Sequence, residues 1–216
     1  ECGWNKDGKK DTTLPTKEEV FEAMSTRLHE LSAEGTPVDT ITFSGNGEPT
    51  MHPAFAQIID FTLQLRDKLY PSAKVSVLTN ASQLGKKEVR DALQKIDNPI
   101  LKIDSPLEHL VEAINIPNAA YKLNDAIENI KLFNHNFILQ TMFLKGVENG
   151  VEIDCTCKEH VEAWQNLVRE LAPREVMMYT IDRETPAKNL QKVTVEEMEA
   201  IAAPLVKEGF KIQIRG

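Results

Sequence analysis

The clearest chemical signal is a short turn that follows a β-rich run and reads Ser44-Gly45-Asn46-Gly47-Glu48. Its glycines let the backbone approach a ligand closely or adopt positive φ. Glu48 then presents a carboxylate that suits a ligand ammonium group. A phosphate site is disfavoured, because such a loop presents Lys or backbone N–H groups and a carboxylate would repel the anion. The turn therefore predicts a site for a cationic group, with a ligand-free βα turn as the alternative.

Other polar residues stand at the ends of later β-rich runs, where barrel-type α/β proteins place their sites. They are Thr79 and Asn80, Lys102, Asp104 and Ser105, Gln140, Thr180, and Asp182 and Arg183. Lys102 either forms a structural ion pair with Asp104 or binds an anion or carbonyl group of a substrate. Asp182 and Arg183 either form an ion-paired loop or contact the substrate. Hydrogen bonding that fixes a strand end is the alternative role for Asn80 and Asp104.

Strands alternate with helical segments along the chain, which predicts right-handed βαβ units and a parallel sheet. The expected strands are Val38–Ser44, Ala73–Asn80, Pro99–Asp104, Asn136–Phe143, Glu175–Ile181 and Lys211–Arg215. The expected helices are Lys17–Glu34, Pro53–Leu69, Lys86–Lys95, Leu107–Ile114, Leu123–Phe133, Lys158–Leu171 and Val195–Lys207. Two helix starts read as capping boxes, at Thr16 and at Thr194, and Pro53 is expected at the first position of its helix.

Each expected strand has one apolar face and one face that turns polar toward its C-terminal end. In the first strand Ile41 and Phe43 share a face, whereas Thr40 and Thr42 share the other. A flat parallel sheet with helices on both sides would be apolar on both faces. The pattern predicts a partial (β/α)6 TIM-like barrel, with helices outside and a polar cavity inside, in one domain over residues 1–216.

Bulk composition excludes several classes of protein. The 216 residues carry a net charge of −8, which argues against tight non-specific binding to nucleic acid. No apolar run approaches the roughly 18–20 residues of a membrane span, and no signal peptide opens the sequence. We expect a cytoplasmic protein. The three cysteines, Cys2, Cys155 and Cys157, are too few for a disulfide framework, and Cys155 and Cys157 are expected in a loop rather than in a metal site.

The segment "FSGNGEPTMHP" resembles the glycine–glycine–glutamate region of radical S-adenosylmethionine (SAM) enzymes. The resemblance implies that this segment binds the amino group of the methionine part of SAM. It also implies that the strand ends after it contact SAM or substrate. The implied SAM-binding residues are Ser44, Gly45, Asn46, Gly47, Glu48, Thr79, Asn80, Asp104, Ser105, Gln140 and Thr180. The implied catalytic residues are Lys102, Asp182 and Arg183.

The family's second hallmark is a Cys-x3-Cys-x2-Cys loop after the first barrel strand, which holds a [4Fe–4S] cluster. Glu1-Cys2-Gly3-Trp4 resembles the sequence just after the third cluster cysteine in a subgroup of Fe–S oxidoreductases related to wyosine-type tRNA-modifying enzymes. The first strand is therefore expected to be missing and the chain to be truncated at its N-terminus. Cys2 is either an extra cysteine or the third cluster ligand, and the truncated chain is not expected to act alone.

The implied activity of the full-length protein is reductive cleavage of SAM to a 5′-deoxyadenosyl radical that abstracts hydrogen from a substrate. A reduced [4Fe–4S] cluster and an electron donor such as flavodoxin or ferredoxin are implied with it. The substrate is expected to be an RNA base or a protein or peptide, and a membrane partner is not expected. Two other classes remain open. One is a non-enzymatic SAM- or nucleotide-binding module, and the other is a metal-free (β/α) barrel hydrolase or lyase that uses Glu48 and Asp104.

Overall fold

The computed structural model describes residues 14–44, 47–117, 121–148, 150–182, 187 and 189–216. It confirms an α/β fold built on a six-stranded sheet. The strands, in their order across the sheet, are β1 (Thr40–Phe43), β2 (Lys74–Thr79), β3 (Asn98–Lys102), β4 (Ile138–Met142), β7 (Glu175–Tyr179) and β9 (Ile212–Arg215). The pairs β1–β2, β4–β7 and β7–β9 are parallel. This is the sheet expected of a partial (β/α) barrel.

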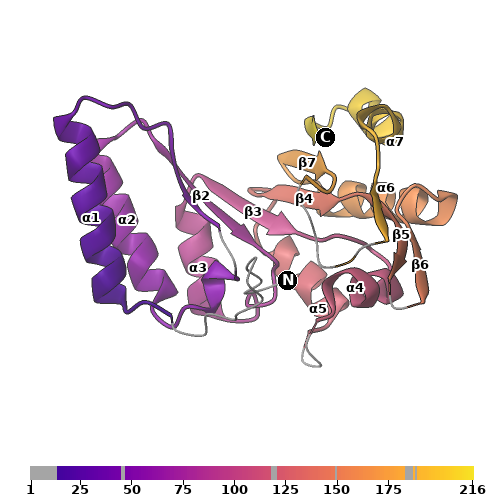
Figure 1. Ribbon diagram of the computed structural model, residues 1–216, viewed down its shortest axis with the longest axis horizontal. Helices are drawn as coiled ribbons and strands as arrows, with labels where there is room; N and C mark the ends of the chain where they lie inside the picture. Colours follow the sequence, from indigo (N-terminus) through magenta and orange to yellow (C-terminus); the bar gives the residue numbers. More distant parts are fainter. Residues whose placement is uncertain (1–13, 45–46, 118–120, 149, 183–186, 188) are drawn as a thin grey trace. The chain divides into compact units, whose positions relative to one another are not determined.

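Helices separate the strands along the chain, as the sequence predicts (Figure 1). They are α1 (Lys17–Ala33), η1 (Pro49–Met51), α2 (Phe55–Leu69), α3 (Lys87–Lys95), α4 (Glu108–Asn115), α5 (Leu123–Lys131), α6 (Lys158–Leu171) and α7 (Val195–Lys207). The chain divides into two compact units, Glu1–Ile100 and Leu101–Gly216, with the division inside β3.

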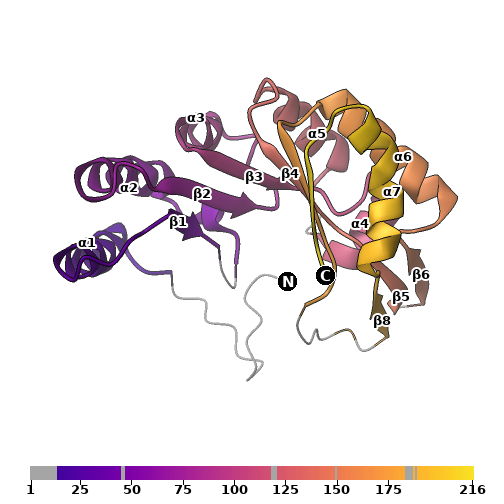
Figure 2. The ribbon, with the colours of Figure 1, turned by 90° about the horizontal axis from the view of Figure 1, so that it is seen from above.

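In the first unit, α1 and α2 lie side by side (Figures 1 and 2). Phe21 of α1 stacks on Phe61 of α2 with 4.3 Å between ring centroids. Asp97, just before β3, joins α2 to β2: its carboxylate accepts hydrogen bonds from Arg66 Nη1 at 2.8 Å and from Val75 N at 2.9 Å. These contacts hold the end of α2 against the strand that carries part of the candidate site.

In the second unit, one part of the core lies where α6 packs beside β4. Trp164 of α6 is fully buried and packs edge-on against Phe143, with 5.1 Å between ring centroids. Its Nε1 donates to Thr141 Oγ1 at 3.1 Å, and the Thr141 hydroxyl donates to the carbonyl of Ile103 at 2.8 Å. A polar chain therefore fixes α6 to the C-terminal end of β3.

A second, three-stranded sheet was not expected from the sequence. It consists of β6 (Val151–Asp154), β5 (Leu144–Glu148) and β8 (Leu190–Lys192) in that order, with antiparallel pairing (Figure 2). Gly146, in the middle of β5, has a φ of +137°. Short strands with a central glycine carry a weak local signal, so tertiary pairing decides their conformation.

Both predicted capping boxes are confirmed: Thr16 and Thr194 accept from the backbone N–H three residues later, and the glutamate there reaches back. The prediction for Pro53 is wrong, because α2 begins at Phe55. The chain first forms the 3-10 turn η1 and leaves it through an extended His52, whose Nδ1 accepts from Ala54 N at 3.1 Å. The helix therefore starts two residues later than the proline position suggests.

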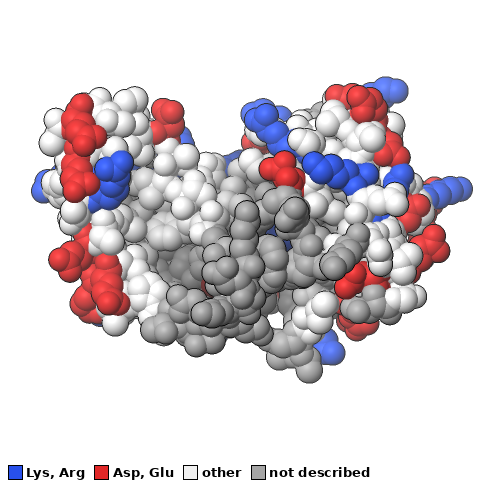
Figure 3. Space-filling view, in the orientation of Figure 1, with Lys and Arg blue, Asp and Glu red and all other residues white. Residues whose placement is uncertain are grey.

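Acidic and basic side chains both occur on the face of the molecule drawn in Figure 3. On the face in Figure 3, acidic side chains gather over α1 and α2, with lysines and arginines interspersed. Within the described residues, no helix has both the length and the apolar character needed to cross a membrane.

Candidate functional site

Glu48 occupies the turn between β1 and η1 in the first unit, and its carboxylate is held firmly. Only 9% of the residue is exposed. One oxygen, Oε1, accepts from Thr50 N at 3.1 Å and from Thr50 Oγ1 at 2.5 Å. The other, Oε2, accepts from Asn80 N at 2.7 Å. A carboxylate has about four acceptor sites. The three hydrogen bonds from Thr50 and Asn80 therefore leave one site for a donor group of a ligand.

The carboxylate therefore joins two strand ends that are far apart in the sequence. Glu48 follows β1, and Asn80 follows β2, which pairs with β1 in parallel. The Asn80 side chain in turn accepts from Ser82 N at 3.0 Å and shapes the turn after β2. Contacts at the ends of both strands fix the Glu48 carboxylate, so the charge is oriented before any ligand arrives.

Thr50 is a site residue that sequence reasoning missed. It is 2% exposed, and its hydroxyl lies 3.4 Å from Thr79 Oγ1 as well as donating to Glu48. The signal was present in the sequence: Glu48 precedes Pro49 and is the N-cap residue of η1, so its side chain faces the second residue after it.

The other residues predicted to bind a ligand at this turn are Ser44, Gly45, Asn46 and Gly47. Ser44 is exposed at the end of β1. A Cβ on Gly47 would meet no atom within 4 Å, which leaves room beside Glu48. Gly45 and Asn46 lie outside the described residues, so their predicted roles stay predictions.

In the second unit, Lys102 and Asp104 form a buried ion pair after β3. Lys102 Nζ lies 2.8 Å from Asp104 Oδ2; the Asp104 side chain is 0% exposed and that of Lys102 is 27% exposed. Asp104 Oδ1 also accepts from Met142 N at 3.2 Å, which ties the carboxylate to the end of β4. The arrangement is the structural ion pair that the sequence left open, and the ligand role of Lys102 stays a prediction.

Two tyrosines complete this cluster, and neither was assigned a role from the sequence. Tyr179, the last residue of β7, is hydrogen-bonded to Lys102. Burial by itself would lower the pKa of Lys102, but Asp104 and Tyr179 outweigh it and hold that pKa above its usual value. Burial, with a contribution from the charge of Asp104, raises the pKa of Tyr121 to about 12. Lys102 is thus held as a cation, and the Tyr121 phenol near it stays neutral.

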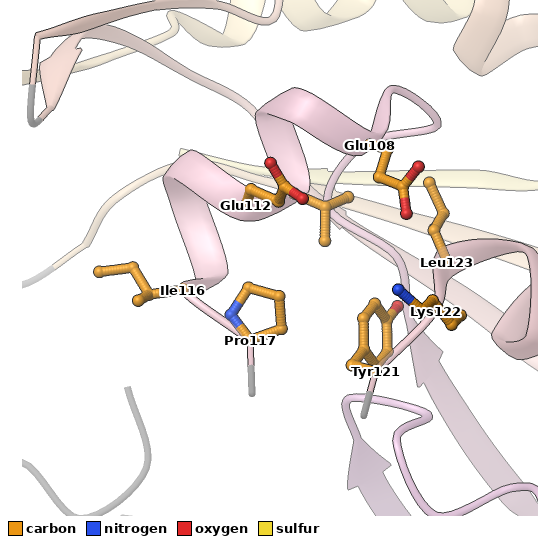
Figure 4. Close-up of a pocket in the computed structure, with 8 residues that line it drawn as sticks. Glu108, Glu112, Ile116, Pro117, Tyr121, Lys122 and Leu123 are labelled. Carbon is orange, nitrogen blue, oxygen red and sulfur yellow. The ribbon is translucent and has the colours of Figure 1, made fainter. Parts of the chain in front are cut away.

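Tyr121 also lines a cavity of about 300 Å³ between α4 and α5 (Figure 4). The lining residues are Glu108, Val111, Glu112, Ile116, Pro117, Tyr121, Lys122 and Leu123. Figure 4 shows Glu108 and Glu112 projecting from α4 on one side, with Pro117 and Tyr121 on the other. The cavity is large enough for a small organic group, and Tyr121 connects it to the Lys102–Asp104 pair.

The remaining predicted residues of the second unit have local partners or face solvent. Ser105 Oγ accepts from Leu107 N at 3.0 Å, and Thr180 Oγ1 accepts from Val193 N at 3.0 Å. Gln140 is half-buried in β4, and Asp182 is exposed after β7. Arg183 lies outside the described residues.

The described residues do not fit an iron–sulfur cluster. They contain no group of three or more His, Cys, Asp or Glu side chains placed to hold a metal ion. Cys155 is buried, and burial raises the pKa of its thiol to about 12, which disfavours the thiolate that metals bind. Cys157 is the N-cap residue of α6. Cys2 lies outside the described residues.

The first unit does fit the methionine end of SAM. An ammonium group needs a fixed anionic acceptor, and Glu48 supplies one that has spare acceptor capacity and open space at Gly47. The polar side chains at the end of β2 lie next to it. The predicted role of these residues toward SAM stays a prediction.

Solved structures with a similar fold include a radical SAM enzyme and a protein bound to S-adenosylmethionine. Streptococcus suis SuiB bound to S-adenosylmethionine superposes with a TM-score of 0.68 and 15% identity over 96% of this chain and 45% of SuiB. A radical SAM methyltransferase from Sphaerobacter thermophilus gives a TM-score of 0.70 and 16% identity over 94% of this chain and 58% of that enzyme. Archaeal TYW1 gives a TM-score of 0.55 and 12% identity over 95% of this chain and 68% of TYW1. The chain has the fold that these enzymes share.

Curated relatives are more similar in sequence but longer. A UPF0026 protein of Synechocystis is 30% identical over 180 residues, which are 81% of this chain and 61% of that protein. A protein named GTPase Obg from Brachyspira hyodysenteriae is 27% identical over 176 residues, 80% of this chain and 24% of that protein. No protein-family model matches. The chain thus spans from about a quarter to three fifths of the length of these relatives.

Proposed function

We propose that the chain is the SAM-binding part of a radical SAM enzyme. The observation that carries the proposal is the Glu48 carboxylate, fixed by Thr50 and Asn80 where two parallel strands end. It is supported by a fold that this chain shares with radical SAM enzymes, one of them solved with SAM bound. An enzyme that uses SAM needs a preoriented acceptor for its amino group, and this turn provides one.

Each residue then has a defined task. Glu48 accepts a charge-assisted hydrogen bond from the ammonium group of SAM, and Thr50 and the Asn80 main chain keep the carboxylate from rotating. Ser44, Thr79 and Asn80 offer hydrogen bonds to the rest of the cofactor. In the second unit, Lys102 presents a fixed cation to a polar group of the substrate.

In radical SAM enzymes, reduced SAM supplies the reactive group that removes hydrogen from a substrate. We propose that the cluster ligands of the full protein precede the described residues. No described cysteine is suited to that role. The electron donor is proposed to be a flavodoxin or ferredoxin.

The substrate is proposed to be either an RNA base or a protein or peptide. Net charge of −8 and the mixed charges in Figure 3 favour a peptide over an extended nucleic-acid surface. A SuiB structure similar to this chain was solved bound to a precursor peptide, with a TM-score of 0.69 and 15% identity.

The first test is SAM cleavage by the full gene product. The protein is loaded anaerobically with iron and sulfide, reduced with dithionite and given SAM, and 5′-deoxyadenosine is quantified by chromatography. Formation of 5′-deoxyadenosine supports the proposal. Cluster loading without product, in the presence of candidate peptides and RNA, would contradict it. Turnover of any substrate without iron or SAM would favour a metal-free hydrolase or lyase.

The second test isolates Glu48. In the loaded protein, Glu48→Gln is expected to weaken SAM binding about 10- to 100-fold, because it removes one charged hydrogen bond. Binding of 5′-methylthioadenosine, which lacks the amino group, should not change. Glu22→Gln is the matched control, because Glu22 is exposed on α1. Equal loss of affinity for both ligands would show that Glu48 only supports the fold.

A further inference from the structure

His52 is a residue of the Glu48 turn to which the proposed function gives no task. It caps the C-terminal end of η1, where its main-chain N–H donates to the carbonyl of Pro49 at 3.1 Å. Both nitrogens of its ring also have hydrogen-bond partners. Nδ1 accepts from Ala54 N at 3.1 Å, and Nε2 lies 2.8 Å from the carbonyl oxygen of Pro15. The ring therefore links the turn to a segment 37 residues away in the sequence.

These two contacts fix the tautomer of the ring. A backbone N–H can only donate and a carbonyl can only accept. Nδ1 must therefore be the acceptor, and Nε2 must carry the hydrogen that it donates to Pro15. A single tautomer of His52 satisfies both partners at once, so the ring is held in one orientation between main-chain groups of two segments.

The link joins the start of α1 to the start of α2. Pro15 directly precedes Thr16, the N-cap residue of α1, and Ala54 is the N-cap residue of α2. A second contact joins the same two helices, because Lys17 Nζ donates to Gln57 Oε1 at 2.9 Å. The end of η1 is therefore anchored to a distant part of the chain.

Anchoring η1 bears on Glu48 through Thr50. Thr50 is the middle residue of η1, and its N–H and its hydroxyl both donate to Glu48 Oε1. The turn is short: Met51 N donates to the Glu48 carbonyl at 3.0 Å, and His52 N donates to the Pro49 carbonyl. Hydrogen bonds of a 3-10 turn have poor geometry. Contacts at the end of η1 therefore decide how firmly Thr50 holds the carboxylate.

We propose that His52 is a positioning residue, whose ring Nε2–H holds the end of η1 to Pro15 and so keeps Thr50 against the Glu48 carboxylate. Its meaning for ligand binding rests on the proposed function, in which Glu48 accepts from the ammonium group of SAM. His52 acts through Thr50 and makes no contact with the ligand. Its task is to limit the opening of the hydrogen bonds between Thr50 and Glu48, and that opening can be measured without SAM or a cluster.

Two substitutions separate the two ring contacts. In His52→Asn, the side-chain oxygen replaces Nδ1 as the acceptor for Ala54 N, but the side chain is too short to reach Pro15. In His52→Gln, the longer side chain places an amide N–H where Nε2 stands and keeps the donor to Pro15. Amide hydrogen exchange of Thr50 is measured by NMR in the ligand-free 216-residue chain, and urea unfolding gives the global stability. His29→Asn is the matched control, because His29 is exposed on α1.

The Thr50 amide should exchange about 3- to 10-fold faster in His52→Asn, the effect of losing one net hydrogen bond, and at the wild-type rate in His52→Gln and His29→Asn. In the loaded protein, His52→Asn should weaken SAM binding by a similar factor and leave binding of 5′-methylthioadenosine unchanged. Added to Glu48→Gln, it should have no further effect, because it acts through the Glu48 carboxylate.

Two results would overturn the proposal. Equal Thr50 exchange in His52→Asn and His52→Gln would mean that the contact with Pro15 does not hold η1. A loss of SAM affinity that adds to that of Glu48→Gln, or that extends equally to 5′-methylthioadenosine, would mean that His52 only supports the fold. The exchange measurement involves no SAM, so failure of the positioning and failure of the proposed function are distinguishable.

Discussion

Replacing Lys102 with methionine should be among the most damaging changes to the stability of the second unit. The substitution removes the cation 2.8 Å from an Asp104 carboxylate that has 0% exposure, and so leaves a buried charge without its counter-ion. Breaking a buried pair in this way costs about 3–5 kcal/mol, a large part of the roughly 5–15 kcal/mol that stabilises a typical domain. Asp104→Asn should cost less, because the side chain of Lys102 is 27% exposed and its ammonium group can turn to water.

The double variant Lys102→Met/Asp104→Asn makes this reasoning refutable. It removes both charges, and the Asn side-chain carbonyl can still accept from Met142 N. Its cost should therefore fall below that of Lys102→Met alone, with a coupling of about 2 kcal/mol or more. Urea unfolding with linear extrapolation measures the loss in free energy of unfolding for the two single variants and the double variant. Lys87→Met is the control, because the Lys87–Asp91 pair is exposed and should contribute under about 0.5 kcal/mol. A cost for Lys102→Met as small as that of the control would refute the buried pair.

Two further predictions concern stability. The pKa of Asp97 is about 2: burial would raise it, but the hydrogen bonds from Val75, Arg66 and other partners outweigh that effect. The carboxylate therefore stabilises the fold above pH 4, and this contribution disappears as pH falls to about 2. Asp97→Asn should cost about 2 kcal/mol at pH 7 and almost nothing at pH 2 in urea unfolding, and a pH-independent cost would contradict the assignment. Gly146→Ala should lower Tm by several degrees, because its φ is +137° and the added Cβ would clash with the main chain of Asn189. Gly85→Ala, where a Cβ meets nothing within 4 Å, should have little effect.

The sequence by itself determined the features that depend on near neighbours. Alternation of strand and helix, the two capping boxes and the polar strand ends are local patterns, and the structure has them where the sequence placed them. Glu48 belongs with these only in part, because its N-cap contact with Thr50 is local, whereas the hydrogen bond from Asn80 N comes from the end of the next strand. The start of α2 was misplaced because proline is compatible with both a first helical turn and the turn before it.

Only the tertiary structure decided which of the polar residues meet. Tyr121 and Tyr179 carry no local mark of function, since each becomes informative through residues far from it in the sequence. The β5–β6–β8 sheet likewise exists only because its three short strands pair with one another. The burial of Asp104 is likewise decided by tertiary contacts and not by its neighbours in the sequence. An aspartate at a strand end reads as a ligand contact from the sequence alone. Burial and the contact with β4 make it a charge whose counter-ion and position the fold must supply.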